Sequence, residues 1–320
     1  MKLSQTGKFY TATVFMFLVF SSVLTILFPL QGELKDMYSI LFGQASLFLA
    51  LFISVAVLFV KRKKQGLTTL YFPFVNKNPG GHNVFAYLLI IPLSFVIIYG
   101  FNDINEVILY LFSRVGIKGS AITVFWTTPT YLVIALLLIG LTPALLEEIF
   151  IRGYCLDGMS GLKNKYAILL SALLFSVLHM NPAQTVYQFL LGIILALLVK
   201  ISGKITYSIL LHFCNNAFVV LFTYISESLE DNVVNLSFGL WSVAYAIAGI
   251  IGVSAIIFLF AYIFKRKQSP NETTLKFLKN RMNIESGDIT SATKVEKMLF
   301  WGFFAIVGVV WVLNTLLLSM

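Results

Sequence analysis

Long apolar runs divide the chain, and short polar stretches separate them. The runs lie at about 9–29, 40–60, 84–100, 127–156, 166–180, 184–199, 205–225, 241–264 and 299–319. Most are near the ~20 residues that a helix needs to cross a bilayer. Backbone groups in lipid have no water to bond, so each span must be a helix, and the alternation typical of an outer-membrane barrel is missing. The pattern predicts an all-α, polytopic transmembrane helix bundle with eight to nine spans.

The first and last apolar runs of the chain both follow positions with basic residues. Lys2 and Lys8 precede the apolar run from Phe9 to Phe28, as in a signal peptide. That run is too long for a signal peptide and no small-x-small cleavage site follows it, so we expect an uncleaved first span. The polar stretch 268–298 is expected to be a cytoplasmic loop with room for a short helix before the last span.

Composition agrees with a membrane protein. Hydrophobic residues make up 58% of the chain and charged residues 12%, against about 25% charged residues in soluble domains. The formal charge of +9 comes from short clusters at the ends of apolar runs, such as Lys61–Lys64 and Lys265–Lys267. Such clusters favour contact with anionic lipid and argue against nucleic acid as a partner. Two cysteines without a CxxC pair exclude a disulfide framework and argue against a cysteine zinc site.

The basic clusters also predict an orientation. A cytoplasmic N-terminus places 61–64, 152–165, 200–204 and 265–297 on the cytoplasmic side under nine spans. Asp103 and Glu106 then fall on the outer side beyond the third span, and Arg114 and Lys118 there are exceptions. We expect a multi-pass plasma membrane protein, and the lack of eukaryotic trafficking features favours a bacterial one.

Few ionisable residues lie inside the apolar runs, and they are the candidate functional residues. They are Glu147, Glu148, Arg152, His179 and His212. A charged group in a membrane helix costs at least about 2.5–3.5 kcal/mol, so each is a functional hypothesis by default. Glu148 and Arg152 are four residues apart and can pair on one helix face. Glu147 projects about 100° away from Glu148, so the two carboxylates need not play the same part.

Two further pairs have helical spacing. Phe175 and His179 are four residues apart, as are His212 and Asn216. Each pair therefore projects from one face, and the three helices can converge on one polar pocket. Pro143, four residues before Glu147, is expected to kink its helix and help to open a cavity.

These residues carry a family resemblance. Glu147-Glu148-Ile-Phe-Ile-Arg152 resembles the EExxxR signature of the CAAX-protease and bacteriocin-processing (CPBP) family of intramembrane endopeptidases. Phe175-Ser-Val-Leu-His179 is similar to its FxxxH element, and His212-Phe-Cys-Asn-Asn216 to its HxxxN element. The three patterns occur in the family's order, on separate apolar segments, and cover about 143–217. The implied domains are N-terminal membrane helices at 1–125, a catalytic core at 126–265, and a loop with an additional span at 266–320.

The resemblance implies hydrolysis of a peptide bond inside the membrane. Glu147 would be the general base on a water, and His179 would orient that water or share its proton. His212 and Asn216 would donate hydrogen bonds to the developing oxyanion. Glu148 and Arg152 would form a structural pair. Metal dependence stays open: Glu147, His179 and His212 are candidate zinc ligands, and a glutamate protease without metal is the other reading.

The expected substrate is a membrane-anchored or membrane-delivered peptide, such as a CAAX-like tail, a pheromone or a bacteriocin-type peptide. Two alternatives use the same residues. The first is a proton-coupled transporter, although the internal repeats and paired broken helices of transporters are missing. The second is a non-proteolytic scaffold, immunity or regulatory protein.

Overall fold

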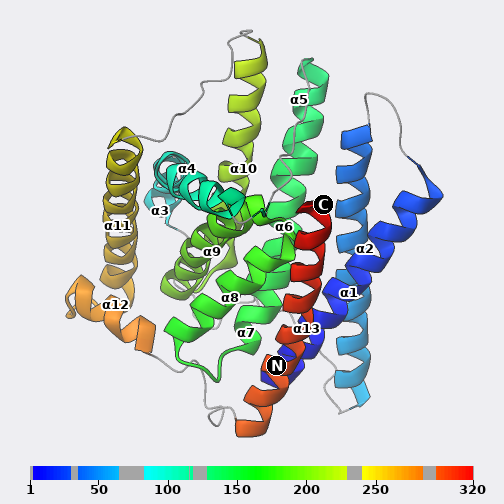
Figure 1. Ribbon diagram of the computed structural model, residues 1–320. Helices are drawn as coiled ribbons and strands as arrows, with labels where there is room; N and C mark the ends of the chain where they lie inside the picture. The colour runs from blue at the N-terminus through cyan, green and yellow to red at the C-terminus, as the bar shows by residue number, and fades with distance from the viewer. Residues whose placement is uncertain are drawn as a thin grey trace.

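The computed structural model describes residues 3–29, 35–64, 83–114, 116–117, 128–228, 240–283 and 293–319, and these residues are helical apart from turns (Figure 1). The helices are α1 (Leu3–Leu27), α2 (Lys35–Lys64), α3 (Val84–Leu88), α4 (Ile90–Arg114), α5 (Pro129–Ala135), α6 (Thr142–Glu148), α7 (Leu156–Gly158), α8 (Asn164–Leu178), α9 (Pro182–Ser202), α10 (Ile205–Ser228), α11 (Leu240–Gln268), α12 (Thr274–Asn283) and α13 (Lys294–Ser319). Two π-helical segments, η1 (Leu136–Leu141) and η2 (Ile149–Cys155), join α5, α6 and α7.

Length and apolar composition mark eight helical stretches in the described part of the chain as candidate membrane spans. Helix α8 is shorter, with 15 residues, or about 22 Å at 1.5 Å per residue. The protein is therefore a multi-span membrane protein, and the predicted all-α bundle is confirmed.

The third span is longer than the sequence predicts. The prediction ends it at residue 100 and places Asp103 and Glu106 beyond the helix, whereas α4 continues to Arg114. Apolar residues keep recurring at helical spacing after residue 100, so the buried stripe is not interrupted by the two acidic residues. Asn105 on this extension is 7% exposed and contacts α9. Lys118, an exception to the predicted orientation, lies outside the described residues.

Small residues let neighbouring helices approach closely. A Cβ atom built on Gly249 of α11 would lie 2.2 Å from the Cα atom of Gly100 on α4. A Cβ atom on Gly192 of α9 would lie 3.0 Å from the Cα atom of Ala172 on α8. Close approach through small residues is how membrane helices gain packing contacts without a hydrophobic driving force between them.

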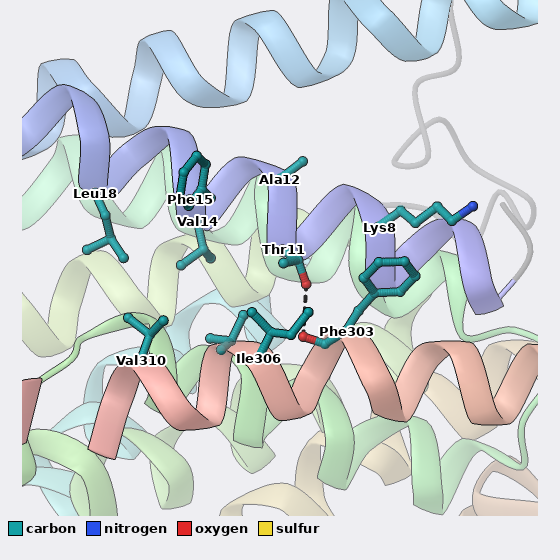
Figure 2. Close-up of a pocket in the computed structure, with 10 residues that line it drawn as sticks. Lys8, Thr11, Ala12, Val14, Phe15, Leu18, Phe303, Ile306 and Val310 are labelled. Carbon is teal, nitrogen blue, oxygen red and sulfur yellow. Dashed lines mark hydrogen bonds between the residues drawn. The ribbon is translucent and has the colours of Figure 1, made fainter. Parts of the chain in front are cut away.

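The last span packs against the first. Figure 2 shows α13 along α1, with Thr11 donating a hydrogen bond of 3.1 Å to the carbonyl of Phe303. Apolar side chains, among them Phe15, Leu18 and Val310, line the groove between the two helices. In Figure 1 α11 and α12 lie on the opposite flank, with α6 to α9 between them and the α1–α13 pair. In the residues that the structure describes, the polar stretch before α13 contains the short helix α12.

Candidate active site

The two adjacent glutamates stand at the end of a short α-helical segment between two π-helical ones. Glu147 and Glu148 end α6, which η1 precedes and η2 follows. Pro143 is the second residue of this segment, and the π-helical turns of η1 directly precede the segment. Proline has no N–H group and cannot donate to the carbonyl four residues earlier. Irregular helix of this kind is common at functional sites.

Glu148 is fully buried and bound on several sides. Its Oε1 atom lies 2.8 Å from Nη1 of Arg152, which confirms the predicted pair. Oε1 is also 3.2 Å from Nδ1 of His212, and the Ser208 hydroxyl donates to Oε2. Charge-assisted hydrogen bonds of this kind compensate for the cost of burying a carboxylate.

Arg152 is held by more than its salt bridge. Its Nη2 atom donates to the carbonyl of Gly192 on α9 at 3.2 Å. Its guanidinium carbon lies 4.2 Å from the centroid of the Phe175 ring, in the geometry of a cation–π contact. Arg152 therefore joins η2, α8 and α9 at one buried point.

Glu147 has a different environment. It is 8% exposed, and its Oε2 atom is buried without a hydrogen-bond partner among the described residues. The nearest basic atom is Nε2 of His179, at 3.8 Å. The Nδ1 atom of His179 lies 2.9 Å from the carbonyl of Phe175. Because a carbonyl only accepts, Nδ1 carries a hydrogen, and in the neutral form of the ring Nε2 presents its lone pair towards Glu147.

The turn that carries His179 is fixed by polar side chains. Met180, in the turn, has φ of 48°, and Asn181 caps α9 through a bond to the N–H of Ala183. Asn105 donates to the carbonyl of Ala183 at 3.0 Å. Ser176 donates to the carbonyl of Thr185 at 2.5 Å. The Asn181 bond satisfies a backbone N–H that the start of α9 leaves without a helical partner, and the other two bonds join α9 to α4 and α8.

Asn216 and His212, the two expected oxyanion donors, each bind a group of the protein itself. The Nδ2 atom of Asn216 donates to the carbonyl of Ile139 in η1 at 3.0 Å. His212 directs Nδ1 to Glu148, so only its Nε2 atom is free to face a substrate. Both residues nevertheless line the same cavity.

That cavity has a volume of about 670 Å³ and lies between α1, α2, α4, α9, α10 and the α5–α6 stretch. Glu147, His179, His212 and Asn216 all line it. Glu148 and Arg152 are not in its lining and support it from behind. The predicted convergence of three helices on one polar pocket is therefore present in the structure.

Two contributors were missed by the sequence analysis. Ser208 lies four residues before His212 on the same face of α10, and this spacing was the available signal. The second is a pair, Tyr187 and Asn215, whose hydroxyl and side-chain oxygen form a bond of 2.7 Å across α9 and α10. No short motif marks that pair.

The proposed zinc ligands do not form a metal site in this arrangement. Within the described ranges, no group of three or more histidine, cysteine, aspartate or glutamate side chains could hold a metal ion. The Nε2 atom of His179 lies 3.8 Å from Oε2 of Glu147, and the Nδ1 atom of His212 bonds to Glu148.

Comparison with known proteins gives one result. No curated protein and no solved structure matches the chain. Residues 129–218 match the family model described as type II CAAX prenyl endopeptidase Rce1-like. This segment runs from the first residue of α5 into α10, and it contains both glutamates, Arg152, both histidines and Asn216. The chain therefore carries a domain of the Rce1-like CAAX endopeptidase family, whose members are intramembrane proteases, and the predicted family is confirmed.

Proposed function

We propose that the protein is an intramembrane endopeptidase in which Glu147 and His179 activate a water molecule. The observation that carries this proposal is the free, buried Oε2 atom of Glu147, 3.8 Å from Nε2 of His179. A carboxylate and an imidazole lone pair are both acceptors, so they need a shared donor between them. A water that donates one hydrogen to each would keep a lone pair directed away from both, towards the cavity.

The reaction follows from this arrangement. The water oxygen forms a bond to the carbonyl carbon of the scissile peptide as Glu147 takes one of its protons. The carbonyl oxygen becomes an oxyanion in the tetrahedral intermediate. The C–N bond then breaks, the carbonyl re-forms, and Glu147 returns its proton to the leaving amine. A carboxylic acid and an amine are produced from one peptide bond and one water.

His212 would stabilise the oxyanion with the support of Glu148. Its Nδ1–H is directed to the Glu148 carboxylate, so Nε2 can donate only when the ring is an imidazolium. The Glu148 carboxylate fixes the orientation of the ring through this bond, and Ser208 and Arg152 hold the carboxylate in place. Asn216 would contribute the N–H that its bond to Ile139 leaves free. Preorganised donors of this kind usually supply the largest electrostatic share of catalysis.

The substrate is proposed to be a peptide anchored in, or delivered to, the membrane. The active-site residues are surrounded by candidate membrane spans, and the cavity between them has predominantly apolar walls. CAAX-like tails, pheromones and bacteriocin-type peptides all meet this description. No step of the proposed mechanism runs through a metal.

The test is a cleavage assay with the full chain purified in detergent. Wild type and Glu147→Gln are offered a library of quenched membrane-anchored peptides, prenylated and unprenylated, each with and without a chelator. We expect wild type to cleave, with the rate falling about 100- to 10,000-fold in Glu147→Gln and unchanged by the chelator. Equal cleavage by both proteins would reject the proposed role of Glu147. If neither cleaved and both complemented a cellular phenotype equally, the scaffold reading would replace the protease.

A further inference from the structure

A groove between α1 and α13 contains none of the proposed catalytic residues (Figure 2). Lys8 stands at one end of this groove, and Leu18 lies at the other. The helical rise from Lys8 to Leu18 is about 15 Å at 1.5 Å per residue. One leaflet contributes about the same length, since the hydrocarbon core of a bilayer is about 30 Å thick. The groove can therefore hold a chain that reaches from the head-group level to the middle of the membrane.

The walls of the groove are apolar along this length. Apart from Lys8 and Thr11, the described lining consists of alanine, valine, leucine, isoleucine and phenylalanine side chains. The Thr11 hydroxyl donates to the carbonyl of Phe303, so its hydrogen is already used. Phe15 and Ile306 are 65% and 53% exposed, which leaves the groove open to the surroundings of the bundle. Around a membrane span those surroundings are lipid, so hydrocarbon is the favoured content.

The groove has the width of a single hydrocarbon chain. Its volume is about 290 Å³, which over a length of about 15 Å gives a cross-section of about 20 Å². Carbon atoms in contact lie about 3.5–4.0 Å apart, so one chain fills such a section. A helix with its side chains is about 10–12 Å across and cannot lie within it.

The Lys8 end of the groove is the basic end of α1, α2 and α13. Helix α2 returns beside α1, with Thr13 donating to Ser54, so the last turn of α2 lies level with the first turns of α1. A Cβ atom on Gly7 would lie 3.3 Å from the Cα atom of Phe300, so α13 begins at the same end. In the described parts of these three helices, Glu296 is the acidic residue at this end, and the lysines there are Lys8, Lys61, Lys63, Lys64, Lys294 and Lys297.

Lys8 is placed to hold an anion at the mouth of the groove. Its ammonium nitrogen lies 5.9 Å from the centroid of the Phe303 ring, within the range of a cation–π contact. Phe303 itself lines the groove, so this contact keeps the ammonium group at the end of the apolar walls. The Lys8 side chain is exposed, and an ammonium group has three N–H donors to offer.

We propose that the groove binds an anionic phospholipid, with one acyl chain between α1 and α13 and the phosphate group on Lys8. Charge complementarity selects this lipid, because a lysine ammonium pairs with phosphate and the neighbouring lysines favour a head group of net negative charge. A zwitterionic lipid offers the same chain but gains less from the lysines, since its head group also carries a positive charge. The inference does not depend on proteolysis, and its test needs no cleavage.

Binding is measured by native mass spectrometry of the full-length protein in detergent. Phosphatidylglycerol and phosphatidylcholine with identical acyl chains are titrated separately. We expect phosphatidylglycerol to bind about five- to tenfold more tightly, which corresponds to the attraction of one or two lysines near a lipid surface. Equal affinities for the two lipids would overturn the inference.

The role of Lys8 is tested against another lysine at the same basic end. Lys8→Gln should lower the affinity for phosphatidylglycerol about fivefold and leave the affinity for phosphatidylcholine unchanged. Lys64→Gln is the matched control, because Lys64 is exposed and lies outside the groove lining, and it should have a clearly smaller effect. A Lys64→Gln loss as large as that of Lys8→Gln would show that the lysines act as a diffuse charge and would overturn the assigned site.

The position of the acyl chain is tested by filling the groove. Ile306→Trp should lower the affinity for phosphatidylglycerol about tenfold, because the bulky ring displaces methylene groups of the chain. Val309→Trp is the matched control, since Val309 is 59% exposed on the same helix and lies outside the lining. It should bind as wild type does, and thermal unfolding confirms that both variants are folded. Equal affinities for these two variants would contradict the proposed position.

A photoreactive lipid locates the chain in the wild-type protein. Phosphatidylglycerol with a diazirine in its acyl chain should label α1 between Lys8 and Leu18 and α13 between Phe303 and Val310, as mapped by peptide mass spectrometry. Labelling confined to other helices would overturn the inference. The same spectra detect the other occupant, a second copy of the chain. A dimer that Ile306→Trp dissociates and Val309→Trp retains would place that copy in the groove instead of the lipid.

Discussion

The Nδ2 atom of Asn216 donates a hydrogen bond of 3.0 Å to the carbonyl of Ile139. Ile139 lies four residues before Pro143, so it is the carbonyl that a proline leaves without its α-helical donor. A side chain on α10 donates to this carbonyl instead. The bond also ties the stretch that carries Glu147 to the helix that carries His212.

This relationship predicts that Asn216 and Pro143 are energetically coupled. Asn216→Ala should destabilise the protein by about 1–3 kcal/mol, because it removes the side-chain donor from the part-buried Ile139 carbonyl. In a Pro143→Ala background the backbone N–H of residue 143 is restored, so the same Asn216→Ala change should cost less. Thermal unfolding of the four proteins in detergent gives the coupling energy. Strictly additive losses would show that the Asn216 bond does not compensate for the proline.

Replacement of Glu148 is predicted to destabilise the protein, and replacement of Glu147 is not. Glu148→Gln weakens a carboxylate site that Arg152, Ser208 and His212 all contact, and it leaves Arg152 buried without its counter-charge. We expect a loss of about 3–5 kcal/mol, as for other broken buried pairs. Glu147→Gln removes a charge whose Oε2 atom has no partner, so it should unfold at the wild-type temperature or above it. Equal losses for the two variants would contradict the division of roles.

Arg152 is predicted to resist replacement by lysine. Lysine can keep the ion pair with Glu148 but lacks the planar group that lies over Phe175 and the second N–H that reaches Gly192. Arg152→Lys should therefore cost about 1–3 kcal/mol of stability. Phe175→Leu is the partner variant: if the ring contact matters, its cost should be smaller in the Arg152→Lys protein than in wild type. Thermal unfolding of the single and double variants measures this.

One local contact of the site and one approach between helices could be predicted from the sequence, and the other contacts between helices could not. The pair Glu148–Arg152 follows from four-residue spacing on one helix, which needs no knowledge of packing. Placing Glu147 near His179 also succeeded, because polar groups buried in lipid have few partners except one another. Both predictions use rules that hold before the helices are assembled.

The contacts that sequence reasoning missed depend on how α10 packs against the α5–α7 stretch. Ser208 and Glu148 are 60 residues apart, and Asn216 and Ile139 are 77 apart. Serine and asparagine are common in membrane helices as polar contacts between them, so neither residue type singles out its partner. The predicted third span ends at residue 100, before Asp103 and Glu106, whereas α4 continues to Arg114.

The crossing of α4 and α11 is predicted to tolerate no side chain at its centre. A Cβ atom on Gly249 would lie 2.2 Å from the Cα atom of Gly100, and that neighbour is backbone with no flexible end to move aside. Gly249→Ala should therefore separate the helices and cost about 1–3 kcal/mol or more. Gly302 on α13 is the matched control, since a Cβ there meets nothing within 4 Å. Because alanine is the better helix former, Gly302→Ala should gain about 0.5–1 kcal/mol. Thermal unfolding in detergent compares the two, and a Gly249→Ala protein as stable as Gly302→Ala would mean that the two backbones are not in contact in the membrane.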